Sequence, residues 1–130
     1  MSNRRNEEVL VAFLEEATDR LCAIESTLLR LEETGHAEPD LVHGIFRDAH
    51  SIKAGANLLD FKNIERLAHR LENILDLMRR GEVQPDGDVV TALLESVDAL
   101  KELCEHLERS DVMDITHPLA SLARLTGDAN

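Results

Sequence analysis

Apolar residues recur along this chain every three or four positions, which is the period of an amphipathic α-helix. The pattern is interrupted where helices commonly stop or start: at Gly35, Pro39 and Gly81, and at Asp60, which is expected to cap the start of the third helix. It predicts helices over about residues 6–33, 39–57, 61–80, 86–109 and 117–125. The first helix has the clearest apolar stripe, formed by Leu10, Leu14, Ala17, Leu21, Ile24, Leu28 and Leu31.

Four long helices joined by short loops predict an all-α fold, namely an antiparallel four-helix bundle with an additional C-terminal fifth helix. No internal repeat or long linker divides the sequence, so we expect a single domain over residues 1–130. The core must consist of aliphatic side chains, because aromatic residues make up only 2% of the chain. Cys22 and Cys104 lie on or beside apolar stripes and are expected to be buried, reduced thiols.

The formal net charge of −12 narrows the classes of partner. An acidic chain with few aromatic residues is poorly suited to neutralise phosphates or stack on bases, so we expect no nucleic-acid partner. The charge also disfavours an anionic membrane surface, and no apolar run is long enough for membrane insertion. The first residues, MSNRRNEEVL, lack the apolar segment of a secretory signal, so we expect a cytoplasmic protein.

The segment FRDAHSIKAGANLLDF, residues 46–61, combines helical periodicity with chemically competent side chains. Each residue turns about 100° around a helix, which places His50 roughly 140° from the apolar stripe and toward solvent. Lys53 lies one turn further on, where its ammonium can reach an anion bound to the imidazole. Ala54 and Gly55 follow, and these small residues leave access for a large partner.

The third predicted helix carries a polar stripe opposite its apolar face, formed by Glu65, His69, Glu72 and Asp76. The preceding turn centres near Phe61, with His50 eleven residues before it and Glu72 eleven residues after it. Residues equally distant from the turn of an antiparallel hairpin lie at the same height, so Glu72 is expected to meet His50. A carboxylate that accepts the Nδ1 proton fixes the tautomer and leaves Nε2 as a nucleophile. The pattern therefore indicates phosphoryl transfer through His50.

The motif AHSIKAGA, residues 49–56, resembles the His-x-x-Lys-Gly phosphorylation motif of histidine-containing phosphotransfer domains. With LLDF and LAHRLENILDLMRRGE included, most of the chain is similar to the N-terminal phosphotransfer domain of CheA-type chemotaxis sensor kinases. The resemblance implies that His50 accepts the phosphoryl group on Nε2 and that Glu72 bonds Nδ1. It also implies tuning roles for Lys53 and His69. One departure is Ala54, which stands where the family usually has glycine.

The same resemblance implies two protein partners. A histidine kinase catalytic domain, in the same protein or another, phosphorylates such a domain, and a response-regulator receiver of the CheY-like or CheB-like kind accepts the phosphoryl group on an aspartate. Those partners need ATP and Mg²⁺, and we expect no cofactor or metal in this domain, which has no glycine-rich phosphate loop. The domain alone is then a phospho-acceptor and donor without kinase activity. We expect it to be the N-terminal part of a longer sensor histidine kinase, a transferase.

Candidate residues for docking the receiver are His43, Phe46 and Asn57, the last of which replaces another glycine common in the family. Two other interpretations stay open. His50, His69 and Glu72 can in principle form a metal site in a helical bundle, although Lys53 would place a positive charge beside the cation. The chain can also be a helical interaction module without chemistry.

Overall fold

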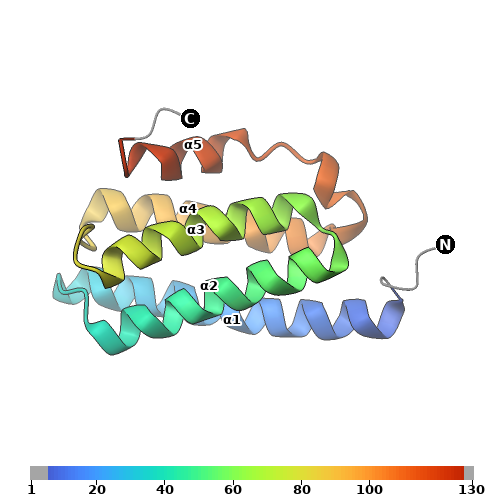
Figure 1. Ribbon diagram of the computed structural model, residues 1–130, viewed down its shortest axis with the longest axis horizontal. Coiled ribbons are helices and arrows are strands. Elements are labelled where there is room, and N and C mark those ends of the chain that lie inside the picture. The colour runs from blue at the N-terminus through green and yellow to red at the C-terminus, as the bar shows by residue number, and fades with distance from the viewer. Residues whose placement is uncertain (1–5, 128–130) are drawn as a thin grey trace.

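The computed structural model describes residues 6–127, which contain six helical segments joined by loops (Figure 1). They are the α-helices α1 (Glu7–Thr34), α2 (Pro39–Leu59), α3 (Lys62–Arg79) and α4 (Gly87–Glu105), the 3-10 helix η2 (Leu107–Val112) and the α-helix α5 (Thr116–Arg124). No strand occurs between residues 6 and 127. Within the same residues, no helix is both long enough and apolar enough to cross a membrane.

The first four helices form a ring in which each helix packs against two neighbours. α1 lies against α2 and α4, and α3 lies against the same two helices. Short connections reverse the chain, so successive helices run in opposite directions (Figure 1). η2 and α5 pack on α3 and α4. The prediction of an all-α antiparallel four-helix bundle with an additional helix is therefore confirmed.

The core holds the hairpin of α2 and α3 against α1. Phe61 lies in the tight turn between α2 and α3, is only 2% exposed, and stacks on Phe13 of α1 with ring centroids 5.9 Å apart. The apolar stripe of α1 is buried from Ala17 onward, whereas Leu10 and Leu14 near its start are half-buried. Full burial of each large apolar side chain contributes roughly 1.5–3 kcal/mol. The turn that sets the register of α2 against α3 is thus fixed by the interior of the bundle.

The turn between α2 and α3 corrects one detail of the sequence prediction. Asp60, expected to cap the start of the third helix, instead ends α2, and its N–H donates to the carbonyls of Ala56 and Asn57. Its φ of 67° is in the left-handed region, where aspartate is tolerated better than most residues other than glycine. α2 consequently continues to Leu59, two residues beyond its predicted end.

The end of α4 also differs from the prediction. The fourth helix was expected to continue to residue 109, but it stops at Glu105 and the chain tightens into η2. Asn63 of α3 holds the far end of η2, because its side-chain amide donates to the carbonyls of Ser110 and Met113, at 2.9 Å each. These bonds between distant segments satisfy carbonyls at and just after the end of η2, and apolar periodicity cannot reveal them.

Replacing Asn63 with alanine is expected to lower the free energy of unfolding by about 1–3 kcal/mol, because the Met113 carbonyl loses its donor and the buried Ser110 carbonyl keeps only the N–H of Met113. Chemical denaturation measures this change. The same replacement at Asn73, an exposed position of α3, is the control and should alter stability by less than about 0.5 kcal/mol. Equal stabilities for the Asn63 variant and the parent would contradict the bridging role of the amide.

The two cysteines lie in different surroundings. Cys104 is buried as expected, and burial raises the pKa of its thiol to about 11. It therefore stays protonated and unreactive at neutral pH. Cys22 is exposed, which corrects the prediction that both thiols are buried. It lies beside the apolar stripe of α1 but on the solvent side of it, directly after the buried Leu21.

Candidate functional site

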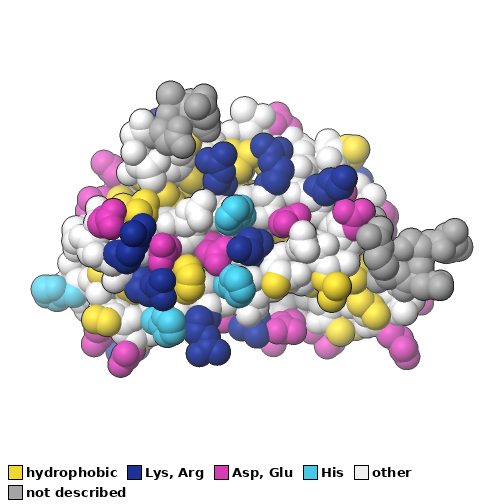
Figure 2. Space-filling view, in the orientation of Figure 1, with side chains coloured by type: hydrophobic (Ala, Val, Ile, Leu, Met, Phe, Trp, Pro, Cys, Tyr) yellow, Lys and Arg dark blue, Asp and Glu magenta, His cyan; other side chains and the backbone are white. Residues whose placement is uncertain are grey.

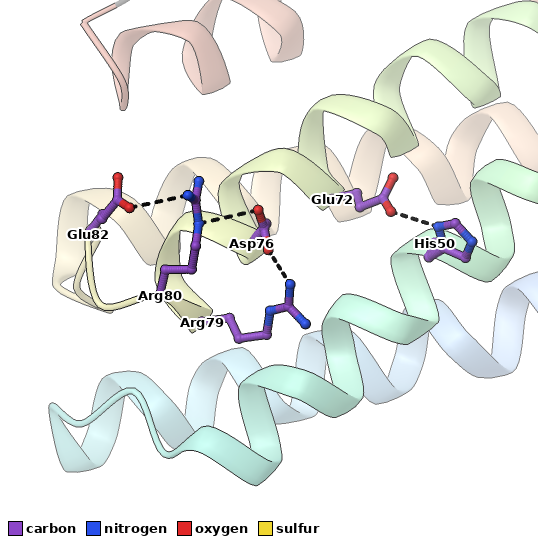
Figure 3. Close-up of polar contacts among 6 residues, drawn as sticks. All are labelled: His50, Glu72, Asp76, Arg79, Arg80 and Glu82. Carbon is purple, nitrogen blue, oxygen red and sulfur yellow. Dashed lines mark hydrogen bonds and ion pairs between the residues drawn. The ribbon is translucent and has the colours of Figure 1, made fainter.

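The hairpin of α2 and α3 brings His50 and Glu72 together across the groove between these helices (Figure 3). Nδ1 of His50 lies 2.7 Å from Oε2 of Glu72. The antiparallel register explains the contact, because the two residues are equally far along the chain from Phe61 in the turn. The predicted contact between these two side chains is confirmed.

Glu72 is the buried member of the pair, with its side chain 9% exposed. The sequence placed it on a polar face, but the close packing of α2 on α3 covers that part of the face. Oε1 lies 2.7 Å from Nζ of Lys53 and has no further hydrogen-bond partner within residues 6–127. Burial raises the pKa of Glu72, but its hydrogen bonds and charge interactions with Lys53 and His50 outweigh burial and leave the pKa below its ordinary value. Glu72 is therefore ionised at neutral pH.

The ionised carboxylate determines the tautomer of His50. A carboxylate can only accept hydrogen bonds, so Nδ1 of His50 must carry the proton in the contact with Oε2. A neutral ring then has its lone pair on Nε2, on the side of the ring that points away from Glu72 (Figure 3). The imidazole side chain is 56% exposed. The site thus presents an accessible nitrogen nucleophile whose second nitrogen is fixed by a buried anion.

The lowered pKa of Glu72 predicts a specific dependence of stability on pH. A carboxyl group whose pKa is lower in the folded than in the unfolded state stabilises the fold above the unfolded pKa, and this contribution disappears as pH falls through the folded pKa. The difference in unfolding free energy between the parent and Glu72→Gln should thus be complete at neutral pH and shrink below the ordinary value of 4.5. Urea denaturation of both proteins at neutral pH and at about pH 3 measures it. A difference that stays constant with pH would contradict the ionised state.

Lys53 and His69 have unequal relations to this pair. Lys53 was expected to reach an anion on the imidazole, whereas in the structure its ammonium is paired with Oε1 of Glu72. His69 is exposed, and it has no hydrogen bond or ion pair with His50, Glu72 or Lys53 among the described contacts. The structure brings three of the four predicted residues into contact, and a tuning role for His69 stays a prediction.

The two small residues after Lys53 face different directions. Ala54 is exposed on α2, as expected of a position that leaves room beside His50. Gly55 points instead toward α1, and a Cβ added there would lie 3.1 Å from the ring of Phe13. The small size of Gly55 therefore serves the packing of α1 against α2. Its predicted role in access to His50 was based on its place in the sequence and did not consider that direction.

The candidate docking residues lie on or near the exposed side of the hairpin. The ring of Phe46, one turn before His50, is half-buried between His43 and Arg79: its centroid is 6.4 Å from that of His43, and the guanidinium carbon of Arg79 is 4.3 Å from it. Asp76 holds Arg79 in place through an ion pair of 2.5 Å (Figure 3). Phe46 is therefore covered on one face by a cation and does not present an open apolar patch.

Arg79 is the neighbour of this site that the sequence reasoning missed. Positive charges stabilise helix C-termini, so the position of Arg79 in the last turn of a helix already explained its charge and suggested no further role. The signal that was available is its spacing from Asp76, three residues earlier on the same surface of the helix. Asn57, the third candidate for docking, donates to Glu65 of α3 at 2.8 Å and so links the two helices on the exposed side.

The metal interpretation finds no geometric support in the described part of the chain. Residues 6–127 contain no group of three or more His, Cys, Asp or Glu side chains arranged to hold a metal ion. At the candidate site itself, Oε1 and Oε2 of Glu72 are taken up by Lys53 and His50. The donor set expected for a metal is therefore not assembled there.

Comparisons with known proteins agree with this geometry. The Hpt domain family matches the chain over residues 8–110. The chemotaxis protein CheA of Salmonella typhimurium is 38% identical over 103 residues, which are 78% of this chain and 15% of that protein. CheA of Treponema pallidum is 34% identical over 127 residues, covering 94% of this chain and 16% of the relative. The chain thus spans about a sixth of the length of these curated relatives.

Solved structures share the fold over almost their whole length. The phosphorylated P1 domain of CheA3 in complex with CheY6 from R. sphaeroides has a TM-score of 0.77 at 26% identity, with 94% of this chain and 95% of that chain covered. The CheA phosphotransferase domain from Thermotoga maritima has a TM-score of 0.72 at 29% identity, with 82% and 98% covered.

Proposed function

Because this chain belongs to the Hpt domain family, we propose that it carries a phosphoryl group on Nε2 of His50 and relays it between two signalling proteins. The observation that carries the proposal is the contact between Nδ1 of His50 and the ionised carboxylate of Glu72. It supports a single tautomer with the nucleophilic lone pair facing solvent.

In the uptake step, the lone pair of Nε2 attacks the γ-phosphorus of ATP held by a histidine kinase catalytic domain. The bond from that phosphorus to the bridging oxygen breaks, and ADP leaves. Positive charge develops on the imidazole as the nitrogen–phosphorus bond forms, and the carboxylate of Glu72 stabilises it through the Nδ1 proton. Lys53 keeps Glu72 ionised by its charge.

In the release step, an aspartate oxygen of a response-regulator receiver attacks the phosphorus. The bond between phosphorus and Nε2 breaks, and its electron pair returns to the imidazole of His50. Phosphoryl transfer requires a metal ion to offset the charge of the transferring group. In this scheme the kinase domain supplies ATP, and each of the two partners supplies the Mg²⁺ for its own step. We assign the receiver to the CheY or CheB type and the pathway to chemotaxis; the pathway is in line with the name of the CheA relatives, and the CheY type is in line with the solved complex of a CheA3 P1 domain with CheY6. The reaction is assigned to the cytoplasm, where ATP is available.

Incubation with a CheA-type kinase catalytic domain, ATP and Mg²⁺ tests the proposal. Mass spectrometry at neutral to alkaline pH should find one acid-labile phosphate, located on His50. The Thermotoga maritima phosphotransferase domain serves as the positive control for the kinase. A kinase that labels the control but leaves this chain unmodified, or modifies it at another residue, would overturn the assignment.

A further inference from the structure

The negative charge of this protein lies mainly away from His50. α1 carries eight acidic and two basic side chains, and α4 carries five acidic and one basic. α3, which borders the groove of His50, carries three acidic and four basic side chains. Figure 2 shows lysine and arginine side chains gathered around the histidines on this face, over α2 and α3. A chain with a net charge of −12 therefore presents its most basic helix beside its candidate nucleophile.

Three of these cations form a line along α3, which we call the basic row: Lys62, Arg66 and Arg70. They are spaced four residues apart, so they lie one above the other over about 12 Å of helix. Lys62 and Arg66 are exposed and Arg70 is half-exposed. None of the three has a carboxylate within ion-pair distance in residues 6–127, whereas Arg20, Arg79 and Lys101 are all paired.

The basic row lies close enough to His50 to share one partner with it. His69 occupies the surface of α3 between the row and Glu72, at a rotation of roughly 60° from Glu72 and roughly 20°, 60° and 100° from Lys62, Arg66 and Arg70. Packed helices are about 8–10 Å apart, and Arg66 and Arg70 line hollows between α3 and α5, so the row lies on the side of α3 that is turned away from α2, beyond His69 as seen from the imidazole. A protein that covers roughly 800 Å² of this face spans both features. The basic row therefore contacts the surface of the partner around its reacting group, while His50 contacts the reacting group itself.

We propose that the basic row binds the acidic residues that surround the acceptor aspartate of the receiver. This proposal rests on the proposed function. The acceptor aspartate works beside Mg²⁺, which proteins hold with carboxylates, so the surface around it is acidic. Cations without a carboxylate partner among residues 6–127 are complementary to that surface, and binding it breaks no ion pair within those residues. Docking through the row leaves Nε2 of His50 facing the acceptor carboxylate.

The test compares two double variants that lower the net charge equally. Arg66→Gln with Arg70→Gln alters the basic row, and Arg30→Gln with Lys101→Gln alters α1 and α4. Glutamine is a good helix former, and circular dichroism checks that both proteins fold. Several CheY-type receivers are first compared, and the one that accepts phosphate fastest from the parent is chosen. Each double variant is then phosphorylated on His50 and mixed with this receiver. The rate of transfer is followed against receiver concentration at low and high salt.

The second-order rate constant of the Arg66 and Arg70 variant should fall about tenfold at low salt, while its rate at saturating receiver stays unchanged. Its salt dependence should also be shallower than that of the parent, and the control should behave as the parent. Equal rates for the two double variants would overturn the docking assignment. So would a loss confined to uptake from the kinase. A parent that never accepts phosphate would instead refute the proposed function itself.

Discussion

We expect His50→Gln to abolish phosphate uptake while the bundle stays folded. Glutamine supplies no nitrogen lone pair that can attack phosphorus, so the loss should be complete and not partial. The side chain of His50 is 56% exposed and contributes no core packing, so the unfolding midpoint should shift little. Labelling from ATP by a CheA-type kinase and a urea melt measure the two effects separately.

The matched control for this variant is His117→Gln. His117 is also exposed, and its nearest acid, Glu95, is 3.9 Å away, so no buried carboxylate fixes its ring. This control should take up phosphate as the parent does. Persistent labelling of the His50 variant would place the acceptor on another residue and contradict the account.

Glu72→Ala should slow uptake by about 100-fold, the low end of the contribution of a positioned proton-holding group. Without the carboxylate, nothing in the described contacts of His50 holds the proton on Nδ1, and the charge that develops on the ring lacks its buried anion. The variant should remain folded, because the freed Lys53 is partly exposed and can be hydrated. Single-turnover labelling with saturating kinase separates this chemical effect from binding.

Asp76→Ala is the control for the loss of an acidic group. Asp76 lies one turn further along α3 and pairs with Arg79 and Arg80, so its removal changes charge near the site without touching the imidazole. Uptake should then stay within about threefold of the parent, a change worth less than about 1 kcal/mol. Equal rates for Glu72→Ala and the parent would show that the tautomer is not controlled by this carboxylate.

The sequence was sufficient to predict the contact of His50 with Glu72 because two simple geometries determine it. Helical periodicity places His50 off the core, and equal distance from the turn at Phe61 places Glu72 opposite. Both follow from backbone geometry, so they do not depend on the details of side-chain packing. The same reasoning accounts for the correct fold class.

Features that depend on three-dimensional packing could not be predicted in this way. The pairing of Lys53 with Glu72 requires knowing that Glu72 is buried, and the sequence had placed it on a polar face. The direction of Gly55 toward Phe13 depends on how closely α1 approaches α2. The position of η2 on α3 involves hydrogen bonds from Asn63, which lies more than forty residues earlier in the chain.

Nuclear magnetic resonance of the phosphorylated protein, with nitrogen-15 in its histidine rings, tests most directly where the phosphoryl group resides. The account predicts one-bond coupling of phosphorus to Nε2 of His50, with a proton retained on Nδ1 beside Glu72. Coupling to Nδ1 of His50, or to a ring nitrogen of His69, would contradict it.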